Sequence, residues 1–307
     1  MITRRFLEEL RRLGPIRFAE PLSTHTTWGV GGPADVYMTA KSGEQLRRAF
    51  AIAREHGVPV LVLGAGSNIL VGDEGFRGLV IENRARQVQG PILRNGIAIV
   101  RAESGVPLAA LARRLGRAGW EGLEWAVGIP GTLGGGVVYN AGAYGGCLAD
   151  VLVCAVVGDA QGCVQTLRRE DLALGYRGSA LTRGLLQDVV VTEVELQVWP
   201  GRRQALEERM RELEARRRAS QPRGRSAGSV FKNPPQRPAW WYVDQVGLRG
   251  YRIGNAQFSL HHANFIINLG QARAADIKAL IDLARGRVRE RFGIDLELEV
   301  ALVGEGF

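Results

Sequence analysis

The segment GIPGTLGGGVVYNAGAYG, Gly128–Gly145, is the most informative part of the chain. It lies inside an uncharged stretch, residues 126–149, that is long enough to cross a bilayer. Pro130, Asn140 and the many glycines nevertheless favour a loop rich in accessible backbone over a membrane helix. Glycine lets an anion approach backbone amides closely. The segment therefore predicts a ligand-binding loop in a protein that does not span a membrane.

A second glycine-rich loop stands earlier in the chain. The apolar run Val58–Leu63 is typical of a strand, and it leads directly into Gly64-Ala65-Gly66-Ser67-Asn68. Such a turn presents backbone amides and polar side chains, which suits a phosphate group. Each loop alone could equally serve only a tight turn. Two such loops in one chain favour a cofactor with a pyrophosphate and a flat ring.

Several common motifs do not fit. The early loop lacks the third glycine of GxGxxG, and the chain has no GxxxxGK[ST] sequence, so a Rossmann or P-loop domain is disfavoured. Residues 224–234 contain a formal GxSxG at Ser226 and a formal SxxK from Ser229 to Lys232. The strand-turn-helix context and the SDN and KTG motifs of serine hydrolases are missing. A serine hydrolase is therefore disfavoured as well.

Helical and extended segments follow one another along the chain. Hydrophobic periodicity predicts helices at 3–13, 43–56, 107–118, 203–220 and 274–292. Strands are expected at 34–40, 58–63, 78–81, 91–94, 97–101, 151–157, 163–167, 189–198 and 295–303, with Asn95-Gly96 as a tight hairpin turn. The fold class is thus α+β. The charged helix 203–220 buries Leu206, Met210 and Leu213 on one face and marks the expected main domain boundary.

Composition limits the class of protein. The chain has 307 residues, 46% hydrophobic and 23% charged, as expected for a globular protein of two or three domains. Met1–Leu10 lacks the apolar core of a secretory signal, so we expect a cytoplasmic protein. The formal charge of +9 could suit nucleic acid, but no nucleic-acid-binding motif is present. A phosphorylated nucleotide explains the densest arginine cluster equally well: Arg216, Arg217, Arg218, Arg223 and Arg225.

The cysteines and histidines predict no metal site. Cys147, Cys154 and Cys163 form no CxxC pair and are odd in number, so we expect core thiols. His261 and His262 would point to opposite faces of a strand, which places them poorly for binding one metal ion. A structural or substrate-contacting role is the better interpretation of this pair.

In their order along the chain, these segments resemble the UDP-N-acetylenolpyruvoylglucosamine reductase (MurB) family over nearly the whole length. The resemblance rests on His25–Ala34, Gly64–Leu70, Gly128–Gly145, Gly175–Ser179, Ser226–Pro234, Gly247–Gly250, Ser259–Asn268 and Leu296–Val300. The short span between Arg177 and Ser229 resembles the type II members, which lack an extra loop with a substrate-clamping tyrosine.

The resemblance implies a three-part organisation with bound FAD and no metal. Residues 1–82 and 83–202 would form two α/β FAD-binding subdomains of the vanillyl-alcohol-oxidase (PCMH) type, and residues 203–307 an α/β substrate-binding domain. Lys232 and Asn233 are the implied substrate contacts. The implied FAD contacts are Gly64, Ala65, Gly66, Ser67, Asn68, Gly128, Gly131, Thr132, Gly134, Asn140 and Ala143.

The implied activity is NADPH-dependent reduction of UDP-N-acetylglucosamine enolpyruvate to UDP-N-acetylmuramate via FAD, in peptidoglycan precursor synthesis for cell-wall growth and division. The enzyme would be a cytoplasmic monomer. Arg177 would stabilise the enolate that forms after hydride addition, and Ser229 would deliver the proton. Glu299 would assist them. The alternative is another FAD-dependent oxidoreductase or oxidase of the same fold.

Overall fold

A computed structural model describes residues 2–307, which divide into two compact units. Unit 1 runs through Phe18 and continues with Val36–Gly64 and Gly78–Arg217. Unit 2 consists of Ala19–Asp35, Ala65–Arg77 and Arg218–Phe307. The three contiguous domains that the resemblance implies, 1–82, 83–202 and 203–307, remain a prediction.

Helices α1 and α2 share a core with the first sheet of unit 1. The sheet has the strand order β1-β2-β5-β3, with β3 parallel to β5. Thr3 and Ser42 cap the two helices, because each side-chain oxygen accepts a hydrogen bond from a first-turn amide. Phe6 and Leu46, one from each helix, are fully buried in the shared core. The elements are α1 (Arg4–Leu13), β1 (Ile16–Pro21), β2 (Pro33–Ala40), α2 (Gly43–Glu55), β3 (Val60–Leu63) and β5 (Phe76–Asn83).

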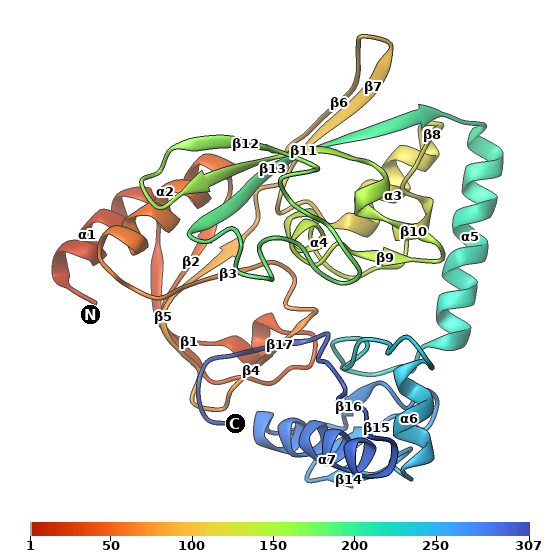
Figure 1. Cartoon of the computed structure of the whole chain (residues 1–307). Helices are drawn as coiled ribbons and strands as arrows, with labels where there is room; N and C mark the ends of the chain where they lie inside the picture. The colour runs from red at the N-terminus through yellow and green to blue at the C-terminus, as the bar shows by residue number, and fades with distance from the viewer. Residues whose placement is uncertain (1) are drawn as a thin grey trace. The chain divides into compact units, whose positions relative to one another are not determined.

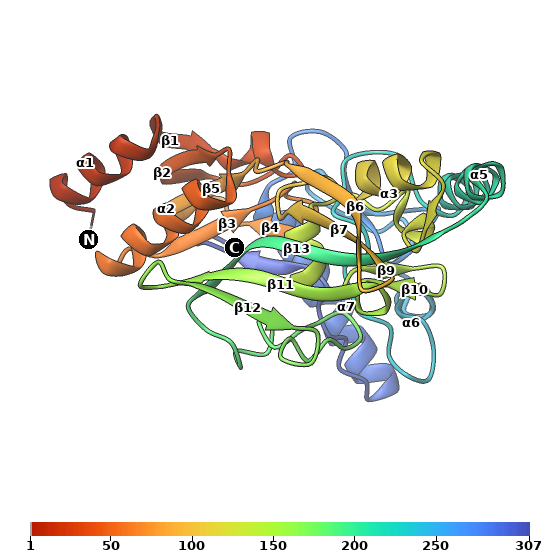
Figure 2. The same cartoon turned by 90° about the horizontal axis from the view of Figure 1, so that it is seen from above.

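The second sheet of unit 1 is antiparallel, with the order β12-β11-β13-β7-β6 (Figures 1 and 2). The β6–β7 hairpin projects beyond the other strands and turns at Asn95 and Gly96, whose positive φ angles confirm the predicted turn (Figure 1). Leu206, Met210 and Leu213 of helix α5 are buried as predicted. The elements are β6 (Val88–Arg94), β7 (Ile97–Glu103), α3 (Leu108–Arg117), β8 (Trp120–Glu121), β11 (Leu152–Asp159), β12 (Val164–Arg168), β13 (Val189–Pro200) and α5 (Arg203–Ser220).

The glycine-rich segment 128–145 differs from the predicted loop, because part of it is helical. Thr132 caps the short helix α4, and Leu133 and Val137 anchor it in the core. Gly134 and Gly136 let the helix approach its neighbours closely. Among residues 2–307, none of the helices has both the length and the apolar character of a membrane span. The elements are η2 (Glu124–Ala126), α4 (Leu133–Val138), β9 (Gly142–Ala143), β10 (Gly146–Cys147) and η3 (Leu148–Asp150).

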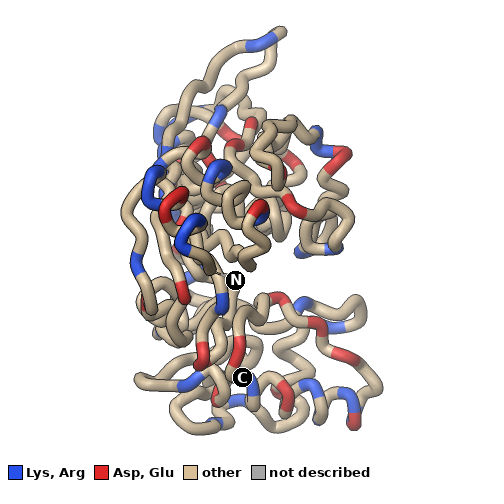
Figure 3. The backbone as a smooth tube through the Cα atoms, turned by 90° about the vertical axis from the view of Figure 1, so that its left-hand side faces the viewer, with Lys and Arg blue, Asp and Glu red and all other residues tan. Residues whose placement is uncertain are grey.

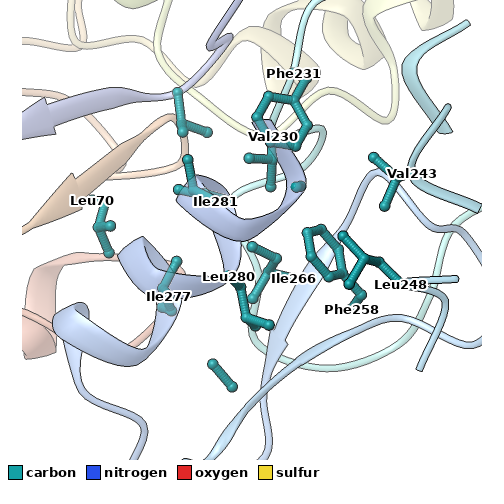
Figure 4. Packing of buried hydrophobic residues seen from close by; sticks show 14 of the residues in the cluster. Leu70, Val230, Phe231, Val243, Leu248, Phe258, Ile266, Ile277, Leu280 and Ile281 are labelled. Carbon is teal, nitrogen blue, oxygen red and sulfur yellow. The ribbon is translucent and has the colours of Figure 1, made fainter. Parts of the chain in front are cut away.

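Unit 2 is built around helix α7. Its predicted apolar stripe is fully buried, and Leu280 and Ile281 face a core that includes Phe258 and Ile266 (Figure 4). Trp28 is also fully buried and donates from Nε1 to the Ile266 carbonyl at 2.7 Å. Strands β14-β15-β16 are antiparallel, whereas β17 runs parallel to β4. The elements are η1 (Leu22–His25), β4 (Ile69–Val71), α6 (Ala239–Gln245), β14 (Arg252–Ile253), β15 (Ala256–Phe258), β16 (Ile266–Asn268), α7 (Ala274–Phe292) and β17 (Ala301–Val303).

Three predictions of local structure were wrong. The closing strand expected at 295–303 forms only at Ala301–Val303. The residues before it lie beside the irregular segment around Phe231, with which Leu298 forms an isolated bridge instead of a continuous strand pairing. Cys163 is exposed rather than a core thiol, since it follows the turn at Gly162. His261 and His262 do not lie in a strand; both backbone amides donate to the Ser259 hydroxyl in a turn.

Two glycines of α7 provide a matched stability test. Gly286 is exposed inside the helix, and an added methyl group would meet nothing within 4 Å. Gly286→Ala should therefore raise the free energy of unfolding by about 0.5–1 kcal/mol. Gly293 ends the helix with φ 66°, so Gly293→Ala should lower it by roughly 1–2 kcal/mol. Denaturant midpoints measure both values; equal effects at the two positions would contradict this helix boundary.

Candidate functional site

Ser229 lies in unit 2 on a segment that is hydrogen-bonded along both edges. The Val230 amide donates to the Asn264 carbonyl at 2.9 Å, and the Val230 carbonyl accepts from the Glu299 amide at 2.8 Å. Val230 and Phe231 are both 0% exposed and point into the core around α7 (Figure 4). Ser229 and Glu299 are half-buried. The backbone therefore brings these two predicted site residues onto neighbouring segments.

The second half of the loop Gly64–Asn68 joins the same arrangement. Asn68 donates from Nδ2 to the Glu299 carbonyl at 3.0 Å, and its own carbonyl accepts from the Ala301 amide at 3.0 Å. Gly66 has φ 60°, and a Cβ atom there would lie 2.1 Å from the His25 carbonyl oxygen. Only glycine fits this position, where the loop passes close to His25, while the bonds of Asn68 join the loop to the Glu299 segment.

Lys232 and Asn233 both have partners inside unit 2. The Lys232 ammonium group forms an ion pair with the Glu297 carboxylate. Asn233 Oδ1 accepts from the Ala239 amide at 2.9 Å, at the start of α6. A substrate that bound these two side chains would have to exchange or share these contacts.

The two glycine-rich loops meet in unit 1. A Cβ atom on Gly64, at the end of β3, would lie 2.5 Å from Thr132 Oγ1 at the start of α4. A Cβ atom on Gly134 would lie 2.8 Å from the Ser104 Cβ atom. These two glycines are thus required by close packing. Gly135, by contrast, is exposed, and the nearest neighbour of an added Cβ atom would be 3.6 Å away, so this position is accessible, although its amide donates to Thr132 Oγ1 in the helix cap.

The remaining part of the glycine-rich segment supports the Arg177 loop. Asn140 is buried; its Nδ2 donates to the Gly175 carbonyl at 2.9 Å and its Oδ1 accepts from the Ala149 amide at 3.0 Å. Ala143 pairs with Gly146 in the hairpin of β9 and β10. Because the Asn140 side chain is engaged by the protein, a ligand could reach only the backbone at this position.

Arg177 is half-buried in unit 1 and has an unusual backbone conformation. Its φ angle of 52° lies in the left-handed region, which costs energy for a residue with a side chain. Its Nη1 donates to the Gly142 carbonyl at 2.9 Å, and Ser179 Oγ donates to the Val138 carbonyl at 2.7 Å. The glycine-rich segment thus holds the loop, and strain of this kind often marks a functional position.

A second arginine lies near Arg177, and the sequence indicated it only through the arginine cluster. Burial lowers the pKa of Arg217, and the positive charge of Arg177 lowers it further, while Tyr144 acts in the opposite direction. Arg216 stacks 5.3 Å from the centre of the Tyr144 ring. Two nearby guanidinium groups repel each other, so an anion bound near them would relieve this repulsion.

The rest of the arginine cluster belongs to unit 2. Arg218 and Arg223 line a cavity of about 390 Å³, together with His261, Gln257 and apolar side chains such as Ile267. Arg225 does not line it and instead covers Gly29, where a Cβ atom would lie 2.8 Å from its Nη1. The cavity combines cationic, polar and apolar groups, which suits part of a nucleotide. Within residues 2–307, no cluster of His, Cys, Asp or Glu could hold a metal ion.

Comparison with known proteins defines the class. Residues 34–168 match the family model of an FAD binding domain, and residues 220–303 match the C-terminal domain model of UDP-N-acetylenolpyruvoylglucosamine reductase. The fold is therefore the predicted α+β arrangement, in which an FAD-binding region is followed by the C-terminal domain of the reductases.

Full-length relatives define the family. The chain is 47% identical over 298 residues to the UDP-N-acetylenolpyruvoylglucosamine reductase of Synechococcus sp. (strain JA-3-3Ab), covering 96% of this chain and 93% of that protein. It is 43% identical over 288 residues to the reductase of Chloroflexus aurantiacus, covering 92% and 96%. The crystal structure of the reductase from Thermus caldophilus matches with a TM-score of 0.78 and 37% identity, covering 94% and 98%. The chain belongs to the UDP-N-acetylenolpyruvoylglucosamine reductase (MurB) family, which confirms the resemblance.

Two adjacent glycines of α4 differ in their surroundings: Gly134 is closely packed, whereas Gly135 is exposed. Gly134→Ala places a methyl group against Ser104 and should lower the free energy of unfolding of the ligand-free protein by roughly 1–3 kcal/mol. Gly135→Ala points into open space and should leave it unchanged or raise it by up to about 1 kcal/mol. Urea unfolding of both variants tests this difference. A larger loss for Gly135→Ala than for Gly134→Ala would show that the orientation of α4 is wrong.

Proposed function

We propose that this protein catalyses the NADPH-dependent reduction of UDP-N-acetylglucosamine enolpyruvate to UDP-N-acetylmuramate, with FAD as its cofactor, in peptidoglycan precursor synthesis. The supporting observation is the 47% identity to a reductase of this name over 96% of the chain, which includes both the FAD-binding and the C-terminal regions. The proposed domain limits, 1–82, 83–202 and 203–307, likewise separate FAD-binding regions from a C-terminal region.

The glycine-rich loops are the proposed binding region for FAD. The close contact of Gly64 with Thr132 and the exposed, side-chain-free surface at Gly135 suit a pyrophosphate, because no side chain obstructs its approach to the backbone. Bound FAD would accept a hydride from NADPH and transfer it to the alkene of the substrate. The proposed contacts are Gly64, Ala65, Gly66, Ser67, Asn68, Gly128, Gly131, Thr132, Gly134, Asn140 and Ala143, with Asn140 acting through its backbone.

Arg177 is proposed to stabilise negative charge on the substrate. Hydride addition to the enol ether places charge on the neighbouring carbon and its carboxylate. A guanidinium group can bind this enolate through two parallel hydrogen bonds more strongly than it binds the starting carboxylate. Arg217 adds a second positive charge nearby, as the effect of Arg177 on its pKa indicates. Together the two arginines would hold an anion without a metal ion.

Ser229 is proposed to donate the proton that completes the reduction. A hydroxyl group is a weak acid, but an enolate carbon is basic enough to accept its proton in a suitable geometry. The hydrogen bonds of Val230 fix the backbone of this segment, which lowers the cost of aligning the hydroxyl group. Glu299, whose amide makes one of these bonds, is proposed to orient Ser229 or the substrate carboxylate.

The nucleotide part of the substrate is proposed to occupy the cavity lined by Arg218 and Arg223. Lys232 and Asn233 are proposed as further substrate contacts. Lys and Arg residues are interspersed with Asp and Glu along the chain (Figure 3), which supports a small anionic ligand rather than nucleic acid. We further propose a monomer that works in the cytoplasm, where NADPH is available.

The proposed activity predicts a strict substrate requirement. Under anaerobic conditions, NADPH should be oxidised beyond the one equivalent that reduces the bound flavin only when UDP-N-acetylglucosamine enolpyruvate is present, with one UDP-N-acetylmuramate formed for each further NADPH consumed. UDP-N-acetylglucosamine is the matched control, because it keeps the nucleotide and sugar but lacks the alkene. Absorbance of NADPH and mass analysis of the product measure both quantities. Oxidation at the same rate with the control would favour an oxidase instead.

The role of Ser229 predicts a selective defect. Ser229→Ala should leave reduction of the bound flavin by NADPH nearly unchanged and slow its reoxidation by the enol ether by a factor of roughly 10²–10⁴, as expected for loss of a general acid. Stopped-flow absorbance measures each half-reaction separately. Ser226→Ala, in the same segment, is the control. Equal losses in both half-reactions would remove the proton-donor role from Ser229.

A further inference from the structure

We propose that Asn264 is the positioning residue that sets the location of the Ser229 hydroxyl group. This inference rests on the proposed function, because it assigns Asn264 a role only through Ser229. Asn264 lies in unit 2, two residues before the start of β16, and is 2% exposed. A buried amide needs partners for all its polar atoms, so its contacts indicate what it holds in place.

The Asn264 side chain makes hydrogen bonds to the backbone after Ser229 that a neighbouring strand would make in a regular sheet. Its Oδ1 accepts from the Phe231 amide at 2.9 Å, and its Nδ2 donates to the Phe231 carbonyl at 2.8 Å. Its backbone carbonyl accepts from the Val230 amide at 2.9 Å. One residue thus satisfies three of the four backbone polar groups of Val230 and Phe231, which directly follow Ser229.

This segment is not part of a regular strand ladder. Among the described residues, Ser229 and Phe231 pair with other segments through isolated bridges: Ser229 pairs with Phe265, and Phe231 pairs with Leu298. A sheet sets its register through many repeated bonds, whereas a pair of isolated bridges leaves it weakly specified. On the edge that faces residues 264–265, the bidentate contact of Asn264 with Phe231 therefore sets which residue faces which, and with it the position of Ser229.

The position of Asn264 is itself supported from the other side. Its backbone amide approaches His262 Nδ1 at 3.3 Å, and the His262 ring lies edge-on to Phe265 at 4.8 Å. Burial lowers the pKa of His262, which keeps the ring neutral and its Nδ1 able to accept a hydrogen bond. These contacts join Asn264 to the turn at 259–264.

Asn268 provides a matched control four residues further along the chain. It is also a buried asparagine, 6% exposed, and is the last residue of β16. Its Nδ2 donates to the Trp28 carbonyl at 2.8 Å, and its Oδ1 accepts from the Gly270 amide at 2.8 Å. Within residues 2–307, the bonds of its side chain reach Trp28, Gly270 and Ala272 rather than residues 229–231. Loss of its amide should therefore cost stability without a specific effect on Ser229.

The test is a double-mutant cycle between Asn264 and Ser229, measured in the flavin-bound protein. Asn264→Leu leaves the polar groups of Phe231 unpaired, and a displacement of the hydroxyl group by about 1 Å is expected to slow reoxidation by the enol ether roughly 10²-fold. In the Ser229→Ala background, the same substitution should change this rate by less than about threefold, because the group it positions is gone. Reduction by NADPH should stay the same in every variant.

Hydrogen exchange supplies a readout that does not depend on activity. Asn264→Leu should speed exchange of the Val230 and Phe231 amides, whereas Asn268→Leu, with a comparable loss of thermal stability, should not. If Asn264→Leu does not fold, Asn264→Asp keeps the shape and the acceptor but loses the donor to the Phe231 carbonyl, and the same cycle applies.

The outcomes distinguish this inference from the proposed function. The positioning role is overturned if the Asn264 and Ser229 substitutions slow flavin reoxidation independently, so that their effects on the rate multiply. It is also overturned if Asn264→Leu leaves hydrogen exchange of the Phe231 amide unchanged. If Ser229→Ala itself fails to slow reoxidation by the enol ether, the proposed role of Ser229 fails regardless of Asn264. A normal Ser229→Ala defect combined with independent Asn264 effects rejects the positioning role alone.

Discussion

The hydrogen bonds along both edges of residues 229–232 are the constraint on which the site of unit 2 depends. On one edge Val230 bonds to Asn264, and on the other Glu299 and Glu297 bond to Val230 and Lys232. These bonds are shielded from water because Val230 and Phe231 are embedded in the core around α7. The polar face of the segment, which carries Ser229, is therefore fixed by an apolar face that the fold requires anyway.

The parts of the fold that the sequence predicted well are those specified by local chemistry. Helix α7 follows from its buried stripe, and the β6–β7 turn follows from Asn95-Gly96, because periodicity and φ preference act within a few residues. The closing strand was predicted too long because its pairing partner is irregular, and that partner is distant in sequence. Helix α4 was missed because its glycines are selected by close tertiary packing against Ser104 and Leu148 rather than by helix propensity.

The candidate site depended more on resemblance than on local physics. Arg177, Ser229 and Glu299 carry no individual signal that separates them from a surface arginine, a turn serine or an exposed carboxylate. The sequence also could not reveal that the side chains of Asn140, Lys232 and Asn233 have partners inside the protein. The sequence also did not reveal that Arg217 lies near Arg177. Arg217 belongs to helix α5, whereas the Arg177 side chain is held by Gly142 in the β9–β10 hairpin, and these elements are far apart in the chain.

One spectroscopic titration tests the central claim most directly. The visible absorbance of the bound flavin is followed under anaerobic conditions, first on addition of NADPH and then on addition of UDP-N-acetylglucosamine enolpyruvate. The account predicts that the flavin bands bleach with NADPH and return fully with one equivalent of the enol ether. A protein that binds no flavin, or a reduced flavin that stays bleached after the enol ether is added, would contradict it.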